Sequence, residues 1–288
     1  MRYAIITNPV SGKMSVDQKR SALAKAAEIL QAEIYGLDTA TPDDFSQLAR
    51  ELAPSCDVLV TAGGDGTVSD IINSVNTEET VIAYLPLGSG NAMRNALNYK
   101  GNLTRIARRI RDGKIHEYDL VDCDGRRRAF MASVGLEGTI IHLRNRYLAQ
   151  GSVGFRVYSK ALFNAYFREY KSAIAKIIID DTEITVKKLL TLMVVKQPYY
   201  GYGVNVVPRA RFDDGQLHIL CVHLGLFNFA SGVATSLTFG NRAGQYRMGR
   251  QVTVKLDRPL VLQIDGNEGW VAEEFVFKVL PKVLKIKC

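Results

Sequence analysis

The sequence predicts an α/β domain over residues 1–118, followed by a mostly antiparallel β-sandwich domain over residues 119–288. Three observations predict this arrangement. The length of 288 residues suits two domains. In the first part, apolar runs of strand length alternate with amphipathic helical stretches, as in a parallel sheet covered by helices on both faces. In the second part, short β-rich segments bounded by turns replace that alternation.

The elements of the first part follow one another in a regular order. Ser15 and Gln18 form a capping box before a helix whose apolar face includes Leu23. Thr41 can cap a helix that begins at Pro42, since proline is favoured at the first helical position. After the third strand, apolar residues recur at the spacing of a helix laid on a sheet. The predicted strands are 3–8, 33–37, 58–62 and 81–86, with a further helix from about residue 92.

The second part contains hairpin signals and two helical stretches. Asp124-Gly125 and the region of Asp180-Asp181 predict tight turns between strands. Helices are predicted over 157–170 and 226–239. The first helix carries aromatic side chains that either line an acyl-chain pocket or pack on the β domain, and we favour packing. These side chains are Phe155, Tyr158, Phe163, Tyr166, Phe167 and Tyr170.

The cysteines and histidines indicate neither a disulfide framework nor a zinc site. His218, Cys221 and His223 share one predicted strand, but Cys221 and His223 face one side and His218 the other. Ordinary sheet packing therefore explains them better than a metal cluster. The cysteines are scattered and form no CxxC pair; they are Cys56, Cys123, Cys221 and Cys288.

Charge and hydropathy limit the partners of the protein. The formal net charge is +8, but the basic residues are dispersed, which argues against a nucleic-acid partner. A mildly basic surface is attracted to an anionic membrane leaflet, although the same charge also serves solubility. No apolar run reaches the ~18 residues of a spanning helix, and residues 1–10 turn polar too early for a signal peptide. We expect a cytoplasmic protein that visits the inner face of the membrane.

Three polar turns containing glycine follow predicted strands. They are NPVSGK (8–13), GGDGT (63–67) and PLGSGN (86–91). None is a P-loop or a GxGxxG fingerprint, and each alone is explained as a tight turn. Ligands of open parallel sheets bind outside the carboxyl ends of the strands. Together, the three turns offer free backbone N–H groups and a helix N-terminus at one edge, which predicts an anion site.

Five motifs resemble the diacylglycerol kinase catalytic-domain family, particularly its small soluble bacterial lipid kinases. Besides the three turns, they are DDGQL (213–217) and IDG (264–266), and they span essentially the whole chain. GGDGT alone would also suit NAD kinases and resembles phosphofructokinases, whereas SGK and GSGN favour the lipid kinases. Ala92 stands where many bacterial members carry Asp, so GSGNA (88–92) is closer to sphingosine kinases. The resemblance implies a first domain like that of NAD kinases and phosphofructokinases, with ATP and Mg²⁺ as cofactors.

The resemblance also implies which residues contact the nucleotide. It expects a threonine before the second helix, where Thr39 fits best and Thr41 stays open, because Thr41 is also the helix cap. The full set is Asn8, Ser11, Gly12, Lys13, Thr39, Gly63, Gly64, Asp65, Gly66, Thr67 and Ser89.

Asp65 is an acid within a predicted phosphate site. Phosphate repels a carboxylate, but ATP arrives with Mg²⁺, which attracts one directly or through water. We expect Asp65 to be a magnesium partner. The alternative is that it only accepts hydrogen bonds from loop amides and caps the helix that follows.

DDGQL resembles a metal loop of the bacterial lipid kinases. In that loop, an Asp side chain and two flanking backbone carbonyls bind a magnesium ion away from the nucleotide. The resemblance maps these ligands to Asp214, Arg211 and Gln216. A turn without metal would explain the Asp-Asp-Gly sequence equally well.

IDGNE (264–268) departs from the family pattern, in which a second acid follows the glycine. Here Asn267 holds that place and Glu268 follows it. Asp265 is therefore the first choice for the general base that phosphoryl transfer needs at the acceptor hydroxyl. A bulge of one residue would present Glu268 instead.

These observations predict an ATP- and Mg²⁺-dependent lipid kinase that phosphorylates a hydroxyl of diacylglycerol or a related membrane lipid. Such a transferase would serve lipid metabolism, including phospholipid biosynthesis. Two alternatives stay open. One is a kinase of a soluble acceptor such as NAD, and the other is a nucleotide- or lipid-binding protein with impaired catalysis, because Asn267 replaces an acid.

Overall fold

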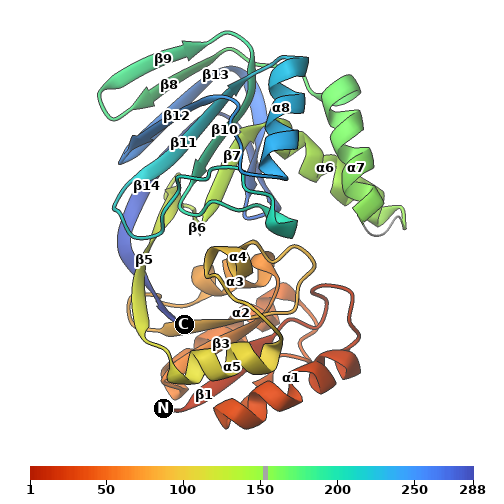
Figure 1. Cartoon of the computed structure of the whole chain (residues 1–288), viewed down its shortest axis with the longest axis vertical. Coiled ribbons are helices and arrows are strands. Elements are labelled where there is room, and N and C mark those ends of the chain that lie inside the picture. Colours follow the sequence, from red (N-terminus) through yellow and green to blue (C-terminus); the bar gives the residue numbers. More distant parts are fainter. Residues whose placement is uncertain (152–154) are drawn as a thin grey trace.

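In a computed structural model, the chain forms two parts that lie one above the other (Figure 1). The structure describes residues 1–151 and 155–288, and of Phe155 only the backbone, so the predicted role of that side chain lies outside the described residues. The first part holds a parallel sheet in the order β4-β3-β1-β2. Its strands are β1 (Tyr3–Thr7), β2 (Glu33–Tyr35), β3 (Val58–Gly63) and β4 (Val81–Pro86).

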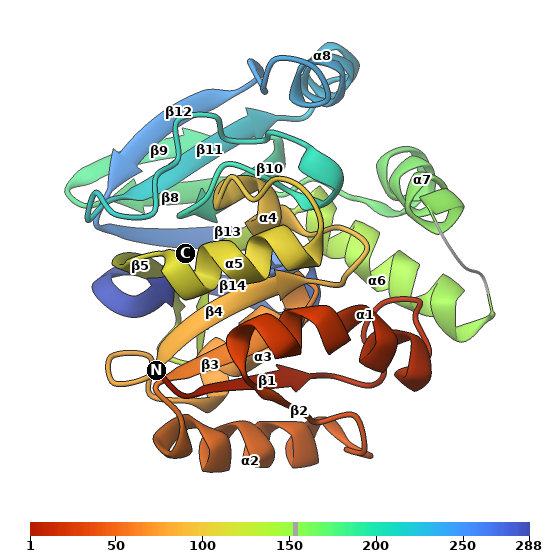
Figure 2. The same ribbon diagram turned by 60° about the horizontal axis from the view of Figure 1, so that its bottom comes forward.

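Helices cover both faces of this sheet, as predicted (Figure 2). α1 (Val16–Leu30) and α5 (Leu103–Asp112) pack together on one face, and α2 (Pro42–Leu52) and α3 (Asp65–Ser74) pack together on the other. Ser15 and Thr41 form the predicted capping boxes of α1 and α2. A short 3₁₀ turn (Ala53–Ser55) follows α2, and α4 (Ala92–Ala96) follows β4.

The second part is built from antiparallel strands, which confirms the predicted change of architecture. A core of buried side chains, among them Ile177, Leu192 and Phe275, lies between its layers. Asp124 and Gly125 both have positive φ, and so does Asp180, which confirms the predicted tight turns. The strands are β5 (Ile115–Cys123), β6 (Arg127–Ala129), β7 (Met131–Gly135), β8 (Ala175–Ile179), β9 (Thr182–Val186), β10 (Leu189–Val195), β11 (Leu217–His223), β12 (Gln245–Gly249), β13 (Gln251–Ile264) and β14 (Asn267–Lys287).

One helix of the second part, α6 (Leu136–Ala149), was absent from the prediction. It begins directly after β7 at Gly135, which has no side chain to cap it. Its inner face also carries Glu137 and Arg144, which interrupt the apolar stripe that normally identifies a helix. α7 (Phe155–Asn164) with the π-helical turn after it (Ala165–Glu169), and α8 (Leu226–Ser236), match the two predicted helical stretches.

Two long strands connect the parts. β5 and β14 pair with each other along the left side of Figure 1, and β14 ends in the lower part. There Lys285 and Ile286 pair in parallel with Val81 and Ile82 of β4, so the last strand extends the first sheet. Leu284 and Ile286 are buried in the core of the first part. No helix among the described residues is long and apolar enough to cross a bilayer.

Candidate active site

The glycine turns after β1, β3 and β4 meet at the carboxyl edge of the parallel sheet. The N–H groups of Leu87 and Gly88 donate to the carbonyl of Gly63 at 2.8 and 3.0 Å. A Cβ atom on Gly88 would lie only 2.3 Å from the Cα atom of Gly64, so the two loops touch through their backbones. This close approach requires glycine, and it confirms that the loops share one edge.

The first loop is held by a lysine that sequence reasoning missed. The Lys19 ammonium donates to the carbonyls of Asn8 and Pro9 at 2.7 and 2.5 Å, and the Ser11 hydroxyl donates to Asn8 O at 2.9 Å. Lys19 is buried, and it lies on the inner face of α1 with Leu23 and Leu30. A lysine at that position of an apolar stripe is the signal that could have identified it.

Asp65 lies at the start of α3 and binds the third loop. One carboxylate oxygen accepts from the N–H of Ala92 at 2.9 Å and the other from the N–H of Met93 at 3.0 Å. The hydrogen bonds to loop amides that we weighed as an alternative are therefore present, although the capped helix is α4 rather than α3. Burial raises the pKa of Asp65, and the two amides offset part of that rise. A role toward magnesium stays a prediction.

The two threonines before α2 have different partners. Thr41 caps α2, because its hydroxyl accepts from the N–H of Asp44 at 3.1 Å. The Thr39 hydroxyl donates to the carbonyl of Gly36 at 2.8 Å, in the loop that follows β2 at the same sheet edge. Neither Thr39 nor Asn8 is among the residues that line the cavity described next.

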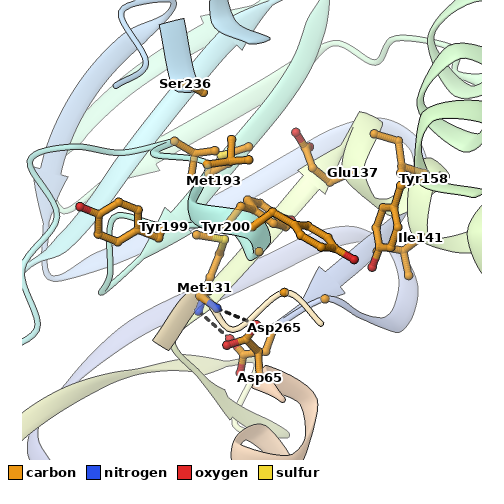
Figure 3. Close-up of a pocket in the computed structure, with 18 of the residues that line it drawn as sticks. Asp65, Met131, Glu137, Ile141, Tyr158, Met193, Tyr199, Tyr200, Ser236 and Asp265 are labelled. Carbon is orange, nitrogen blue, oxygen red and sulfur yellow. Dashed lines mark hydrogen bonds between the residues drawn. The ribbon is translucent and has the colours of Figure 1, made fainter. Parts of the chain in front are cut away.

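A single cavity of about 900 Å³ extends from the glycine loops into the β-rich part (Figure 3). At one end it is lined by the three glycine loops, which we call the phosphate-type loops because such loops commonly bind phosphate. Their lining residues are Ser11, Gly12, Lys13, Gly64, Asp65, Gly66, Thr67, Gly88, Ser89 and Gly90. At the other end, the apolar chamber is lined by side chains of α6, α7, α8, β10 and β11. These include Leu136, Ile140, Ile141, Leu162, Leu190, Met193, Leu220, Val222, Phe229 and Val233.

Asp265 faces this cavity from the tight turn between β13 and β14. Asp265 and Gly266 have φ angles of +46° and +81°, which places both in the left-handed region of a two-residue hairpin turn. The Oδ1 atom accepts from the N–H groups of Phe130 and Met131 at 3.0 and 2.9 Å. The Oδ2 atom is buried and has no hydrogen-bond partner among the described residues.

The surroundings of Asp265 suit a group that takes up a proton. Burial raises the pKa of Asp265 to about 7, against the lowering effect of its backbone hydrogen bonds and of Arg127. The nearby Ser69 hydroxyl also lowers this pKa, although it is not placed to hydrogen-bond with Oδ2. The carboxyl group can therefore exist in both protonation states near neutral pH.

Glu268 lies outside the cavity. It is exposed and interacts with α6, where its Oε1 atom is 3.1 Å from His142 Nδ1 and its Oε2 atom accepts from Asn145 at 3.3 Å. Ile264 pairs with Asn267 and Gln263 with Glu268, so no bulge separates the two strands at the turn. Asn267 instead lines the cavity beside Gly66.

Several cavity residues were not predicted, because long-range packing brings them to the site. Arg144 of α6 donates to the carbonyl of Gly266 at 3.0 Å and to the Tyr158 hydroxyl at 2.5 Å, and so holds the turn that carries Asp265. The N–H of Tyr202 donates to the carbonyl of Gly90 at 2.8 Å, which ties the second part to the third loop. Tyr158 lines the cavity, so the aromatic stretch does not only pack on the sheet.

The DDGQL loop surrounds a cation, but that cation is a lysine side chain. The Lys196 ammonium lies 2.7 Å from Asp214 Oδ1, 2.9 Å from Asp119 Oδ2 and 2.6 Å from the carbonyl of Gln216. Lys196 is completely buried. The ligands expected for magnesium at Asp214 and Gln216 therefore converge as predicted, yet the ammonium occupies the point at which they meet.

The remaining atoms of this loop are engaged as well. The second oxygen of Asp214 lies 2.9 Å from His218 Nε2, and the N–H of Arg211 donates to the same nitrogen at 3.1 Å. His218 Nδ1 lies 2.6 Å from the Tyr246 hydroxyl. Among the described residues, no group of three or more His, Cys, Asp and Glu side chains could hold a metal. His218 and Cys221 are both buried within the β-rich part, as the packing interpretation expects.

The parallel sheet carries glycine loops at its carboxyl edge, and the β-sandwich that closes this edge presents a buried carboxyl group. This combination defines a class of two-domain kinases. Residues 2–123 match the diacylglycerol kinase catalytic domain. Residues 131–288 match the YegS C-terminal NAD kinase beta sandwich-like domain. The chain belongs to the diacylglycerol kinase family that combines these two domains.

Relatives of known name agree with this assignment along the whole chain. Diacylglycerol kinases of Staphylococcus saprophyticus and Staphylococcus epidermidis are 24% and 23% identical to it, over 93% of this chain and 89% and 86% of theirs. A diacylglycerol kinase structure from Bacillus anthracis superposes with a TM-score of 0.76 at 17% identity, over 99% of this chain and 96% of that one. An NAD kinase from Archaeoglobus fulgidus in complex with ATP superposes with a TM-score of 0.56 at 11% sequence identity, over 100% of this chain and 94% of that one.

Proposed function

We propose that this protein is a lipid kinase that transfers the γ-phosphoryl group of ATP to a hydroxyl of a membrane lipid. The observation that carries the proposal is the continuity of the cavity, which joins the phosphate-type loops to the apolar chamber. A nucleotide at the loops and an acyl chain in the chamber would bring their polar ends together beside Asp265. The diacylglycerol kinase relatives support a lipid acceptor, and the NAD kinase in complex with ATP supports ATP as the nucleotide.

The residues of the loops would bind and orient the nucleotide. Backbone N–H groups at Gly12 and Gly64 lie where phosphate oxygens can approach without meeting a side chain. Lys13 adds a positive charge, and Ser89 adds a hydroxyl, at the wall of the same cavity. Asn8 and Thr39 would support the site from beyond that wall, at the same sheet edge.

Magnesium that accompanies ATP would neutralise charge on the phosphates. Asp65 suits a place beside it, because its carboxylate oxygens, which accept from the N–H groups of Ala92 and Met93, are hard ligands of the kind that Mg²⁺ prefers. The hydroxyl oxygens of Ser89 and Thr67 are other hard ligands in the same wall. At the DDGQL loop, in contrast, Lys196 leaves no place for a second ion.

Asp265 would act as the general base. Asp265 lines the cavity, and its buried Oδ2 atom has no hydrogen-bond partner among the described residues, so this oxygen would accept the proton of an acceptor hydroxyl that reaches it. The N–H groups of Phe130 and Met131 hold the other oxygen and fix the orientation of the carboxylate. Arg144 holds the turn in place through Gly266. Because Asp265 is in position, replacement of the following acid by Asn267 does not remove the base.

The apolar chamber favours a lipid over a soluble acceptor such as NAD. The outer faces of the helices around the chamber are apolar too. Leu226, Phe227, Leu237, Phe239, Phe163 and Phe167 are exposed, and we call this group the apolar rim. Tyr166 stacks on Phe229 at 4.1 Å between ring centroids, so the two halves of the rim lie side by side. We propose that the rim touches the cytoplasmic membrane surface while a lipid enters.

A phosphoryl-transfer assay tests the proposed function. Purified protein would be given γ-labelled ATP with diacylglycerol, a monoacylglycerol or a long-chain amino alcohol in detergent micelles, with NAD in buffer, or with no acceptor. We expect label in the lipid only. Label in NAD would show a kinase of a soluble acceptor, and nucleotide binding without any labelled product would show a binding protein.

A further inference from the structure

Glu137 places a carboxyl group in the mostly apolar end of the cavity. It is the second residue of α6, and its Oε2 atom accepts a hydrogen bond from the Thr191 hydroxyl at 2.5 Å. Among the residues that the structure describes, no lysine, arginine or histidine forms an ion pair with it. A carboxyl group in an apolar wall without a cationic partner lowers the stability of the fold. Burial correspondingly raises the pKa of Glu137 to about 7.

Two other polar atoms of the cavity wall lack partners. The Tyr200 hydroxyl and the Gln197 Oε1 atom are buried and have no hydrogen bond within the described part of the chain. The Ser133 hydroxyl donates to Gln263 at 2.9 Å and, as a hydrogen-bonding neighbour, lowers the pKa of Tyr200, so Gln197 Oε1 is the clearer case of a missing partner. Buried polar atoms in folded proteins are almost always hydrogen-bonded. The missing partners therefore indicate a polar group of a ligand at this place.

The position of Tyr200 links Glu137 to the reaction centre. Figure 3 shows its ring between Glu137 on one side and Asp265 on the other. Burial raises the pKa of the Tyr200 hydroxyl most, the negative charge of Glu137 raises it further, and that of Asp265 has a smaller effect of the same sign. A lipid whose reacting hydroxyl lies at Asp265 would therefore have its neighbouring head-group atoms beside Tyr200 and Glu137.

We propose that Glu137 binds a hydrogen-bond donor that the acceptor lipid carries close to the phosphorylated hydroxyl, either an amino group or a second hydroxyl. The inference rests on the proposed function and specifies its substrate class. A long-chain amino alcohol or a monoacylglycerol has such a donor. A diacylglycerol has none, because its two other oxygens are esterified. Glu137 is then a specificity residue, and Thr191 holds its carboxyl group in place.

Three acceptors of equal chain length test this in the unmodified protein. They are a 1-alkanol, the 1,2-alkanediol and the 2-amino-1-alkanol, each presented in the same detergent micelles with ATP and Mg²⁺. A hydrogen bond to a charged group contributes about 1.5–3 kcal/mol, so kcat/KM should be roughly 10- to 100-fold higher for acceptors with the donor. A preference for the amine alone identifies an ammonium, and a preference for both identifies any donor. Equal kcat/KM for all three would overturn the inference.

Substitution of Glu137 localises the effect. Glu137→Leu should abolish the preference while the plain alcohol is still phosphorylated, and Glu137→Gln should selectively reduce the preference for the amine. Glu183→Leu, at an exposed carboxylate of β9 that pairs with Lys176, is the matched control. Preserved preference in a folded Glu137→Leu protein would also overturn the inference. Failure of the proposed function looks different, since no lipid of any kind would then be phosphorylated.

Discussion

Asp265 is distinguished by one oxygen that is held and one that is left without a partner. The held oxygen accepts from Phe130 and Met131, and the other is buried without a hydrogen-bond partner among the described residues. Sequence reasoning selected Asp265 over Glu268 only because it keeps the place of the family aspartate. The structure adds a physical reason, because the in-register hairpin directs Glu268 to His142 and away from the cavity.

The first prediction separates these two acids. Asp265→Asn should lower kcat by roughly 10²- to 10⁴-fold, the usual cost of a lost general base, and leave ATP affinity close to unchanged. Glu268→Gln should lose much less. Steady-state kinetics and calorimetric ATP titration measure both quantities. If Glu268→Gln is the less active of the two folded variants, our assignment of the base is wrong.

The second prediction concerns pH, because burial raises the pKa of Asp265 to about 7. The ionised form is the base, so kcat/KM should rise with pH up to about 7 and then level off. The same shift lowers stability: an unfolded aspartate has a pKa of about 4, so the folded state loses stability as pH rises from about 4 to 7. Asp265→Asn should therefore melt higher than the wild type above pH 7.

Burial also raises the pKa of Glu137 to about 7, so Glu137 contributes to the pH dependence of the wild-type Tm as well. The difference in Tm between the wild type and Asp265→Asn, measured by calorimetry at each pH, isolates Asp265. A difference that does not grow between pH 4 and pH 7 would contradict the assigned shift.

At the scale of elements, the predictions that succeeded depend on local chemistry. Helix caps at Ser15 and Thr41 and the turn at Asp124-Gly125 involve residues that are neighbours in sequence. α6 was missed because Gly135 supplies no cap and Glu137 interrupts its apolar face. On our proposal Glu137 has a functional role in the cavity. The residue that serves the site is therefore also the one that breaks the apolar pattern by which α6 could have been predicted.

The DDGQL loop shows the same limit for a predicted ligand set. The family resemblance implied a magnesium ion at this loop, but nothing in the loop reveals that Lys196, directly after β10, places its ammonium against Asp214 and Gln216. Asp119 of β5 adds a second carboxylate to the same ammonium at 2.9 Å. Only the packing of these separate strands identifies the cation.

The third prediction follows from this lysine. Without nucleotide, neither Mg²⁺ nor EDTA should change the Tm of the wild type. Lys196→Ala leaves two facing carboxyl groups without a cation, which typically costs about 3–5 kcal/mol, and the variant should regain Tm when Mg²⁺ or Ca²⁺ is added. Lys176→Ala, at an exposed ion pair, is the control and should show neither effect. A wild-type Tm that rises with Mg²⁺ would contradict this account, even if Lys196→Ala does not fold.

At the scale of the whole molecule, the parallel sheet, its covering helices and the shared edge of the glycine loops were predictable, because alternating strands and helices permit few topologies. The cavity was not. It forms only because β5 and β14 hold the sandwich over the parallel sheet, and because Tyr202 and Gly90 bond across the two parts. Residues from many separate elements meet there, and no local pattern records their proximity.

The last prediction concerns contact between the whole protein and a membrane. The Phe227 side chain is 83% exposed and Phe239 is 65% exposed, and the Arg242 guanidinium lies 4.7 Å from the Phe239 ring, where it can face anionic lipid. Burial of one Phe side chain contributes about 1.5–3 kcal/mol, so Phe227→Ser should weaken partitioning into anionic vesicles roughly tenfold. Phosphorylation of a short-chain acceptor in solution should stay unchanged.

Sedimentation with phosphatidylglycerol vesicles measures this partitioning. Ile115→Ser removes an exposed apolar side chain at the start of β5, far from α8 in Figure 1, and serves as the control. Both proteins should melt like the wild type, because neither side chain contributes to a core. Equal vesicle binding by Phe227→Ser and Ile115→Ser would show that the apolar rim does not face the membrane. The lipid would then have to reach the chamber by another route, although the chamber and Asp265 would keep their proposed roles.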